Sequence, residues 1–374
     1  MIYFDHASAM TVLPEIIASY PDYLRNCAGN PEAAHGLGRG LRQKISGLEK
    51  AVIAAVFPDR YLNESAVFTA ADASLLLEAV AVIAAPQRGG VAWGSDLEHI
   101  ADTLALRRHF ERVEKMPLDN IGRISACPAG KADLVVITHV QSEIGVRQDL
   151  PDLIGSIRQQ TPQAIILVDA VQSAAWESYP VQAPLPDLLL ISGAKLGAGN
   201  GAALIASGPG TGKFRDGFKQ LRTREHRISK TDPVSLSALA DALTLHRRHH
   251  AEENKQIGLI NAFLREKLAG YTLPNGKKLI LTVPAESAAN NILHLLLPGY
   301  QSGVLVRMFS AENIMLSAGS ACQSETDEPS LILQALNFSK TDAFSGLRLS
   351  FSTENTLEEA GQFLLTMDKI LRNY

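Results

Sequence analysis

Cysteine is scarce in this chain, with three residues among 374, at Cys27, Cys127 and Cys322. Three thiols so far apart along the sequence make neither a disulfide framework nor a zinc site, so we predict no metal site. Residues 1–8 (MIYFDHAS) lack the basic and then apolar pattern of a secretory signal. We therefore expect a cytoplasmic protein, because a reducing compartment keeps thiols available for chemistry.

Long apolar runs and blocks of like charge are also missing. The longest apolar runs, such as 79–86 and 134–138, are too short to span a membrane. Lys and Arg number 35 and Asp and Glu number 39, which gives a net charge of −4 without any basic block. These patterns give no reason for binding to nucleic acid or to an anionic membrane, and we expect neither as a partner.

The chain does contain enough apolar residues for a large core. Hydrophobic residues make up 46% and charged residues 20% of the sequence, which excludes a disordered chain. Short apolar runs alternate with helical stretches, such as 100–113, through the first two thirds of the chain. Strands that are apolar throughout are buried on both faces, so the pattern predicts an α/β fold with a mainly parallel sheet between helices. The expected strands are 66–69, 90–93, 134–138, 165–168 and 188–191.

The last third of the chain has a different pattern. One long helix is expected over 233–268, with Pro233 at its start and Gly270 near its end. Shorter strands and helices follow it. We predict two domains from the length and this change of pattern, a large α/β domain over 15–245 and a smaller α+β domain made of 1–14 and 246–374.

An acidic residue directly follows one of the expected strands, in Val168-Asp169-Ala170-Val171-Gln172-Ser173. Ligands of open α/β sheets bind beyond the carboxyl ends of the strands, so this carboxylate is expected to face a crevice. There it could pair with a cationic ring nitrogen or with a metal ion. Taken by itself, the Asp is more simply interpreted as a helix cap.

A lysine follows the next expected strand, in the segment 188–195 (LLLISGAK), and a glycine-rich loop comes after it. A lysine in this place can form a Schiff base with an aldehyde cofactor, because desolvation lowers the pKa of its amine. A solvated loop lysine is the simpler interpretation of Lys195 alone. The two strand-end motifs together are much less expected by chance than either one. The glycine-rich loop lacks a dinucleotide fingerprint.

Small residues surround the third cysteine, in the segment 316–324 (LSAGSACQS). This composition is typical of an exposed, flexible loop and differs from the apolar surroundings of an inert core cysteine. Cys322 is therefore a candidate nucleophile, and we assign no role to Cys27 or Cys127.

In this order, over nearly the whole chain, the motifs resemble those of the cysteine desulfurases, the class V branch of the fold-type I pyridoxal-phosphate enzymes. The segment Tyr3-Phe4-Asp5-His6-Ala7 is similar to the family's Tyr-Leu-Asp-Asn-Ala, and the spacing after Cys322 is similar to that of the long-loop subgroup. The further matching segments are Gly29-Asn30-Pro31 with 35–39, Glu98-His99, 139–145, 319–322 with 328–330, and 346–350.

The resemblance implies a fold, a cofactor and a reaction. The fold would be that of a fold-type I pyridoxal-phosphate-dependent transferase, with a sheet of the seven-stranded type in the large domain, in a homodimer. The cofactor would be pyridoxal 5′-phosphate. The reaction would convert L-cysteine to L-alanine and transfer the sulfur to Cys322 as a persulfide. An acceptor protein would then take the sulfur for iron–sulfur cluster or thio-cofactor synthesis.

The resemblance also implies roles for individual residues. Lys195 would hold the cofactor as a Schiff base and move the α-proton, while Asp169 would keep the ring nitrogen protonated. Gln172 would bond the ring O3′, and His99 would stack on the ring and assist proton transfer. Arg348 would bind the substrate carboxylate with its planar fork. The remaining predicted contacts are Ser142 to cofactor and substrate, and Ser192, Ser74 and, from the partner subunit, Thr231 to the phosphate.

The predicted phosphate site departs from the family's pattern at two turns. The family's Ser-Gly-Ala-Thr reads Ala70-Ala71-Asp72-Ala73 here, which removes a hydroxyl and adds an acid beside a dianion. Ser74 could replace the hydroxyl. The family's Ser-Gly-His-Lys reads Ser192-Gly193-Ala194-Lys195, which removes a second phosphate partner. We therefore expect weaker cofactor binding than in better-matched relatives.

Three hypotheses follow from these observations. The first is a working cysteine desulfurase. The second is a related pyridoxal-phosphate lyase or aminotransferase of other substrate scope, in which Cys322 is incidental. The third is a degenerate homologue that acts as a binding or regulatory partner. The retained residues Asp169, Gln172, Lys195, Cys322 and Arg348 argue against the third hypothesis, and the altered phosphate site argues for it.

Overall fold

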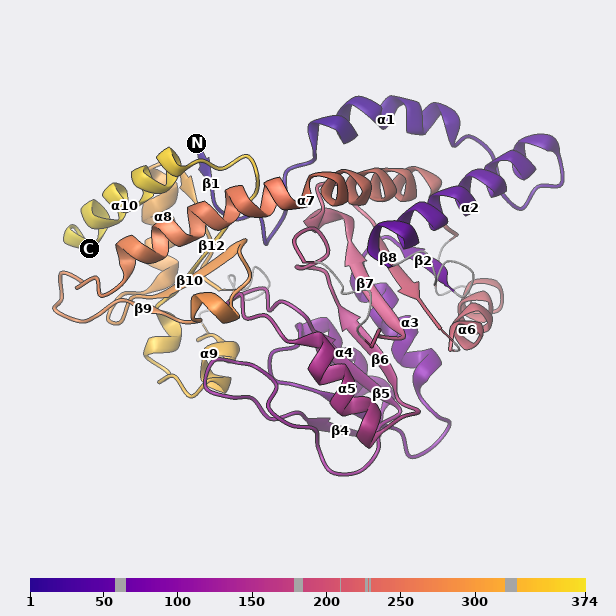
Figure 1. The fold of residues 1–374 in the computed structure, drawn as a ribbon, viewed down its shortest axis with the longest axis horizontal. Helices are drawn as coiled ribbons and strands as arrows, with labels where there is room; N and C mark the ends of the chain where they lie inside the picture. Colours follow the sequence, from indigo (N-terminus) through magenta and orange to yellow (C-terminus); the bar gives the residue numbers. More distant parts are fainter. Residues whose placement is uncertain (58–64, 178–183, 209, 226–227, 229, 320–327) are drawn as a thin grey trace.

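The computed structural model describes residues 1–57, 65–177, 184–208, 210–225, 228, 230–319 and 328–374. A seven-stranded sheet lies at the centre of its larger part (Figure 1). The strand order is β2-β8-β7-β6-β5-β3-β4, and neighbours are parallel except at β8, which is antiparallel to both of its neighbours. The predicted α/β fold with a mainly parallel sheet is thus confirmed. The strands are β2 Ala66–Ala70, β3 Val91–Gly94, β4 Arg112–Lys115, β5 Leu134–Thr138, β6 Ile165–Asp169, β7 Leu188–Ser192 and β8 Ala202–Ala206.

Helices cover both faces of this sheet, because its central strands are apolar at nearly every position. Alternate residues of a strand point to opposite faces. Val135 and Ile137 of β5 therefore join one core with α2, α5 and α7, while Leu134 and Val136 join another with α3, α4 and α6. These helices are α2 Gly36–Val56, α3 Ala73–Ala84, α4 Ile100–His109, α5 Leu150–Gln160, α6 Thr211–Thr223 and α7 Pro233–Leu268.

The smaller part of the molecule is built on a three-stranded antiparallel sheet of order β12-β10-β9. The first strand of the chain, β1, pairs with β11 in a separate parallel pair. The elements of this part are β1 Ile2–Tyr3, β9 Ile280–Leu281, β10 Ile292–Leu296, β11 Ile314–Met315, β12 Gly346–Ser350, α8 Ser302–Ala311, α9 Leu331–Ala335 and α10 Leu357–Arg372, with the 3₁₀ turns η3 Ala285–Ser287 and η5 Asp342–Phe344.

The long helix α7 links the two parts and runs across the upper half of Figure 1, below α1 Pro14–Asn26. Its start is fixed by Pro233 in the first turn and by Asp232, whose carboxylate accepts the N–H bonds of Val234 and Ser235. The bounds match the expected 233–268. The predicted domain boundary at 245/246 falls inside this helix, and the division at 14/15 and 245/246 stays a prediction.

One local expectation was wrong, and one strand was missed. The helix expected over 100–113 ends at His109, and Arg112–Lys115 forms the edge strand β4 beside β3. The chain turns at Phe110, whose backbone is extended and whose ring is buried under α4, so the helix cannot continue. The strand Ala202–Ala206 was not expected, because alanine-rich segments carry little strand signal.

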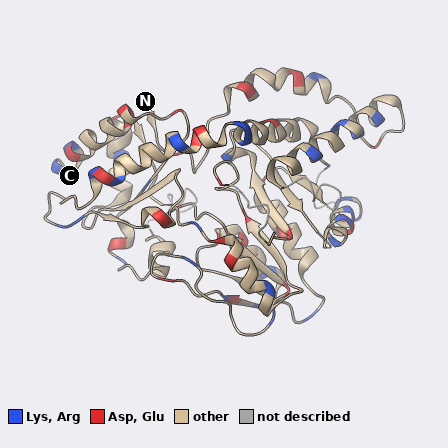
Figure 2. Cartoon of the chain, in the orientation of Figure 1, with Lys and Arg blue, Asp and Glu red and all other residues tan. Residues whose placement is uncertain are grey.

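Charged side chains of both signs are interspersed along the helices (Figure 2). Within the described ranges, no helix combines the length and the apolar character that a membrane crossing requires.

Candidate functional site

The predicted acid and lysine follow neighbouring parallel strands of the large sheet. Asp169 is the last residue of β6, and β7, its parallel neighbour, ends at Ser192. Lys195 follows in the single turn η2 Gly193–Lys195. Because parallel strands end at the same edge of a sheet, both side chains belong to the edge where ligands of such folds bind.

The turn that carries Lys195 is held by close backbone contacts. The N–H of Gly193 donates to the carbonyl of Gly201 at 2.8 Å, and the carbonyl of Gly193 accepts from Ala198 at 3.0 Å. A Cβ atom at position 193 would lie 2.8 Å from the carbonyl oxygen of Gly199. Only glycine fits here, which explains why a glycine precedes the Ala194-Lys195 pair.

The N-terminal segment 5–9 meets several of the predicted site residues. The side-chain amide of Gln172 donates to the carbonyl of Ala7 at 2.9 Å. The amine of Lys195 donates to the carbonyl of Ser8. The extreme N-terminus therefore connects the ends of β6 and β7 to the small part of the molecule, where β1 is paired.

Arg348 lies on β12 and is 1% exposed. Its guanidinium donates to the carboxylate of Asp5 at 2.7 Å, to the hydroxyl of Ser8 at 2.6 Å and to the carbonyl of Ser142 at 2.8 Å. Ser142 thus meets Arg348 through its backbone. The roles of Asp5 and Ser8 as partners of Arg348 were not predicted, although Asp5 lies within the segment 3–7 of the resemblance and Ser8 directly follows it.

Two buried acidic side chains, Glu98 and Asp169, lie on the α4 face of the sheet. Thr138 and Asp169 are paired in register on β5 and β6. Each lies two residues after a side chain of the core under α4, Val136 or Leu167, and therefore points to the same face of the sheet. The carboxylate of Glu98 accepts hydrogen bonds from the backbone and hydroxyl of Thr138, as well as of Ser95. Burial raises the pKa of Glu98 to about 7 and that of Asp169 to about 6.

Asp169 has one carboxylate oxygen engaged, Oδ1, which accepts the N–H of Val171 at 2.9 Å. Beyond this bond, no partner of its side chain is found in the described part of the chain. A buried carboxylate with an oxygen to spare suits a cationic partner. The ring end of the site therefore fits a pyridine nitrogen that carries a proton.

His99 forms the cap of α4, where its Nδ1 accepts the N–H of Ala101 at 3.2 Å. Burial, and then the positive charge of Lys195, lower the pKa of His99. The ring is therefore neutral near pH 7, and its interaction with Lys195 places the two side chains near each other.

The first turn of α4 also contains Asp102, which sequence reasoning missed. It is 1% exposed, and neither of its carboxylate oxygens has a hydrogen-bond partner among the described residues. An acid in the first turn of a helix is an ordinary sequence feature. The feature that distinguishes Asp102 is its burial, which the sequence does not show and the fold does.

The predicted phosphate end has a different character. Asp72 caps α3, and its carboxylate accepts the N–H of Leu75 at 3.0 Å. The carboxylate of Asp72 thus occupies the N-terminus of α3, where a phosphate would bind according to the family's pattern. Ser74 lies exposed in the first turn of the same helix, and Ser192 is half-buried at the end of β7. The residues of this end fit a phosphate less well than the other end fits the ring.

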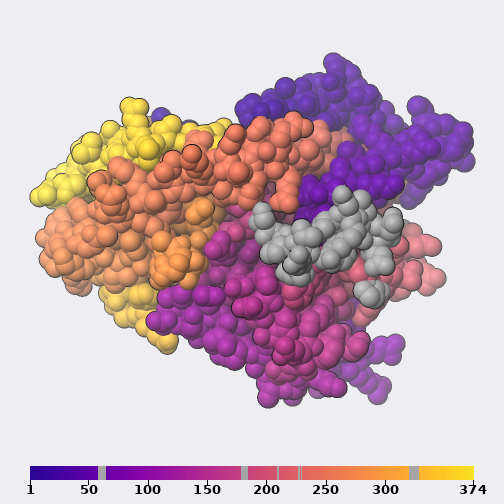
Figure 3. Space-filling model, in the orientation of Figure 1, coloured from indigo at the N-terminus to yellow at the C-terminus, as the bar shows by residue number. Residues whose placement is uncertain are grey.

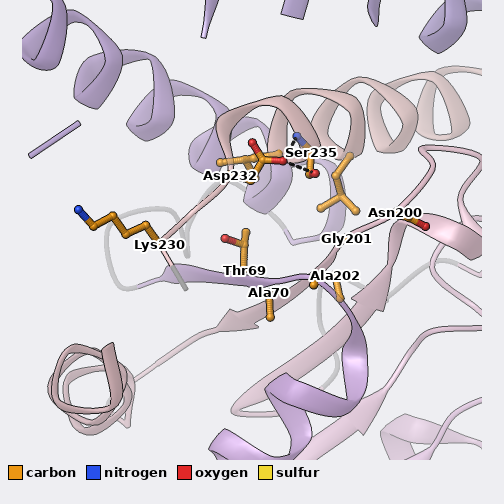
Figure 4. Close-up of a pocket in the computed structure, with 11 residues that line it drawn as sticks. Thr69, Ala70, Asn200, Gly201, Ala202, Lys230, Asp232 and Ser235 are labelled. Atoms are coloured by element: carbon orange, nitrogen blue, oxygen red, sulfur yellow. Dashed lines mark hydrogen bonds between the residues drawn. The ribbon is translucent and has the colours of Figure 1, made fainter. Parts of the chain in front are cut away.

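A cavity of about 250 Å³ lies beside this turn (Figure 4). Thr69 of β2 faces Asp232 and Ser235 at the start of α7 across it, and Ala70 lines it next to Thr69. Lys230, the one cation among the residues that line this cavity, pairs with Glu32 at 2.6 Å. Thr231 lines a different cavity, of about 610 Å³, together with Arg215 and Arg222.

Cys322 lies outside the described residues. Described residues on both sides of it, Ser317 and Ser330, contact residues of the site or its neighbours. Ser317 exchanges two backbone hydrogen bonds with Arg348, at 2.8 and 3.2 Å. On the other side, the hydroxyl of Ser330 donates to Glu143 at 2.5 Å.

The fold and these residues define a class of protein, the α/β enzymes with a lysine and an acid at neighbouring strand ends. Comparison with known proteins narrows this class. The family model described as aminotransferase class-V matches residues 2–208. This covers more than half of the chain, which therefore belongs to the aminotransferase class-V family, a pyridoxal-phosphate-dependent family.

Curated relatives match the whole length of the chain. A NifS/IcsS protein homolog of Lactobacillus delbrueckii subsp. bulgaricus is 26% identical, with 100% of this chain and 98% of the relative covered. A cysteine desulfurase of Rhodobacter capsulatus is 28% identical, with coverage of 99% and 96%. The solved structure of a NifS-like protein from Rickettsia africae superposes with a TM-score of 0.81 at 21% identity, covering 99% of each chain. The predicted fold type is thereby confirmed.

Proposed function

We propose that this protein is a pyridoxal-phosphate-dependent cysteine desulfurase, which converts L-cysteine to L-alanine and transfers the sulfur to Cys322. One observation carries the proposal most directly. The segment 5–9 joins the three predicted site residues: its backbone carbonyls accept from Gln172 and Lys195, and its side chains, those of Asp5 and Ser8, accept from Arg348. Full-length relatives named cysteine desulfurase support the same activity.

Pyridoxal phosphate, when bound, supplies an electron-accepting ring that stabilises negative charge at the α-carbon of an amino acid. Three side chains would hold that ring. Asp169 would keep a proton on the ring nitrogen, Gln172 would bond the ring oxygen O3′, and His99 would lie against the ring as a neutral imidazole. Lys195 would be the attachment residue and would move the α-proton, a role that requires its amine to be unprotonated for part of the cycle.

Arg348 would bind the carboxylate of cysteine. The arginine is already desolvated and paired with Asp5, so a substrate carboxylate meets a guanidinium that is held in place by Asp5 and Ser8. Such a fork fixes the amino acid with charge-assisted hydrogen bonds. Ser142, whose carbonyl accepts from the same arginine, would contact substrate and cofactor.

Cys322 would carry the sulfur. Its thiolate attacks the sulfur of bound cysteine, the C–S bond breaks, and the protein holds the sulfur as a persulfide until an acceptor protein takes it. Because the segment before it pairs with the Arg348 strand at Ser317, the chain reaches position 322 from beside the substrate arginine. Iron–sulfur cluster or thio-cofactor synthesis would use this sulfur.

Ser192, Ser74 and backbone N–H groups would hold the phosphate, with Thr231 of the partner subunit completing the site in a homodimer. Exposed apolar side chains on α1 Pro14–Asn26 support association of two copies. Ile17 is 61% exposed, Tyr20 44% and Leu24 57%. In the space-filling view this helix and α2 form one flank of the molecule (Figure 3). We place the protein in the cytoplasm, where its thiols would stay reduced.

A degenerate homologue with little cofactor is the second candidate, and one observation favours it. The carboxylate of Asp72 occupies the cap of α3, where a phosphate would otherwise meet free N–H groups. A visible absorption spectrum of the protein mixed with pyridoxal phosphate separates the two candidates, because a Schiff base to lysine changes the absorption of the cofactor and Lys195→Ala should abolish that change.

The activity is tested by supplying L-cysteine and a reductant to the cofactor-loaded protein and measuring alanine and sulfide. We expect equal amounts of both products, and neither alanine nor sulfide from Lys195→Ala or from Cys322→Ala, because the C–S bond breaks only when a thiolate takes the sulfur. Cys27→Ala and Cys127→Ala are the matched controls and should retain full activity. Alanine and sulfide in equal amounts from Cys322→Ala would remove the thiol from the mechanism and favour a related lyase. A protein that never binds the cofactor would favour the degenerate homologue.

A further inference from the structure

Asp102 is an acid whose burial the proposed roles do not explain. Its side chain is 1% exposed, and neither oxygen makes a hydrogen bond within the described part of the chain. The backbone N–H of His99 lies near enough to favour the charged form, although its geometry falls short of a hydrogen bond. An ionised carboxylate without partners is costly at such a site, so Asp102 carries a proton in the empty protein.

Asp102 lies near Asp169, the acid that is proposed to face the ring nitrogen. Asp102 lies in the first turn of α4, the helix that covers the sheet face to which Asp169 belongs. Glu98, four residues earlier, bonds Thr138, which is the register partner of Asp169 on the neighbouring strand. The charges of Asp169 and Glu98 both act on Asp102. The titratable groups around it are thus Asp169 on β6, Glu98 and His99 before α4, and Lys195, whose charge acts on His99.

By contrast, the neighbouring acid Glu98 is fully satisfied. It accepts four hydrogen bonds from Ser95 and Thr138, two from backbone N–H groups and two from hydroxyls. Such a carboxylate has a structural reason to be buried. Asp102 has none of these bonds, although it is buried more deeply. A buried acid without hydrogen bonds, Asp102, next to a second acid, Asp169, suits a cation that lies near both carboxylates.

We propose that Asp102 and Asp169 form a carboxyl pair at the ring-nitrogen position. In this pair, Asp102 holds a proton while the site is empty. The pair therefore keeps the ring nitrogen protonated to a higher pH than Asp169 alone would. The inference rests on the proposed function. When an unprotonated ring binds, the O–H bond of Asp102 breaks and an N–H bond forms at the ring nitrogen. No electrons are gained or lost, and the number of protons in the site stays the same.

Asp102 acts on the ring through charge and is therefore a positioning residue. Near pH 6, where the ring nitrogen arrives already protonated, Asp102 keeps its proton and contributes little. At alkaline pH, the ionised Asp102 adds a second negative charge near the ring cation. An opposite charge at a distance of about 4–6 Å shifts a pKa by about 1–3 units, so one unit corresponds to about tenfold in affinity.

The first test needs no cofactor. The infrared spectrum of the empty protein near pH 7 should contain the bands of protonated, buried carboxyl groups, Glu98 among them because its pKa is about 7, and Asp102→Asn should remove one of these bands. Glu98→Gln is the matched control, because it deletes the hydrogen-bonded acid and should leave the Asp102 band in place. Asp102→Val fills the site with an apolar side chain and serves if the amide variant does not fold. A spectrum in which neither Asp102 variant loses a band would overturn the proposal.

The second test is a titration with pyridoxal phosphate from about pH 6 to about pH 9.5, followed by visible absorbance. Wild type and Asp102→Asn should bind alike at the acid end, and the variant should bind about tenfold more weakly at the alkaline end. Its spectral change on loss of the ring proton should come at lower pH than in wild type. Identical pH profiles, or a variant that keeps the ring proton to higher pH, would overturn the pairing while the proposed function stands. If wild type binds no cofactor at any pH, the proposed function fails, and the role of Asp102 toward the ring fails with it.

Discussion

At the scale of single residues, Arg348 shows how the site prepares for an anion. The guanidinium is 1% exposed and donates to Asp5, Ser8 and Ser142. Removing one member of a buried ion pair leaves the other charge unpaired, which costs about 3–5 kcal/mol. A conservative substitution at position 348 is therefore more informative than a truncation.

We predict that Arg348→Lys raises the KM for L-cysteine by about 10- to 100-fold, because lysine keeps the charge but loses the planar fork. The measurement is steady-state alanine formation over a range of cysteine concentrations. Arg372→Lys, at an exposed position near the end of α10, is the control. An unchanged KM with a lowered kcat would show that Arg348 does not bind the substrate.

Asp72 is the residue at which the phosphate end departs most from expectation. Two like charges 4 Å apart in water repel by about 1 kcal/mol, and Asp72 caps the same helix that a phosphate would approach. We predict that Asp72→Thr, which keeps a capping oxygen and removes the charge, tightens binding of pyridoxal phosphate about three- to tenfold. Fluorescence titration of the apoprotein measures this.

Asp152→Thr is the matched control for Asp72→Thr, because it removes an exposed acid from the first turn of α5 instead of α3. Its affinity for the cofactor should equal that of wild type. Equal affinities for wild type and Asp72→Thr would mean that the phosphate does not approach the start of α3.

At the scale of elements, the turn η2 positions Lys195 through Gly193. A Cβ atom there would meet the carbonyl oxygens of Gly199, Asn200 and Gly201 at 2.8–3.3 Å, and backbone atoms cannot move aside alone. We predict that Gly193→Ala lowers the free energy of unfolding by about 1–3 kcal/mol and lowers the yield of cofactor fixed to Lys195 by borohydride. Urea unfolding and peptide mapping measure the two effects.

Gly155→Ala is the control for Gly193→Ala. Gly155 lies inside α5 with open space around its Cα, so alanine should stabilise the protein by about 0.5–1 kcal/mol and leave cofactor attachment unchanged. Full cofactor attachment in Gly193→Ala would show that the turn tolerates displacement of Lys195.

Elements with strong periodicity could be predicted from the sequence, and the others could not. The five apolar strands and α7 carried clear patterns. Alanine-rich β8 and the edge strand β4 did not, because strand formation there depends on neighbouring strands. In the site, the chain order of motifs pointed to Asp169, Lys195 and Arg348. The contacts of residues 5–9 and the burial of Asp102 depend on parts of the chain far apart in sequence, so no local pattern contains them.

At the scale of the whole molecule, buried histidines make the free energy of unfolding depend on pH below neutrality. Burial lowers the pKa of His294 on β10 to about 3, and its Nδ1 bonds the hydroxyl of Thr282 at 2.7 Å. Because an unfolded histidine has a pKa of about 6.5, the stabilisation is fully present above that pH and is lost as pH falls toward 3. Asp169 and Glu98, with raised pKa values, change in the opposite direction, so a comparison of variants is needed.

We predict that wild type loses about 1.4 kcal/mol of unfolding free energy per pH unit relative to His294→Asn, between about pH 6 and about pH 4. Asparagine keeps an acceptor for Thr282 and does not titrate. Urea unfolding of both proteins at a series of pH values measures the difference. Parallel stability curves would mean that His294 does not titrate with folding.

The central claim is that sulfur leaves L-cysteine and arrives at Cys322. The most direct measurement is mass spectrometry of the cofactor-loaded protein after one turnover with cysteine in the absence of reductant. We predict one additional sulfur atom on the peptide that contains Cys322, with the peptides of Cys27 and Cys127 unchanged. Alanine formed without added sulfur on the Cys322 peptide, or sulfur found on another cysteine, would contradict the account.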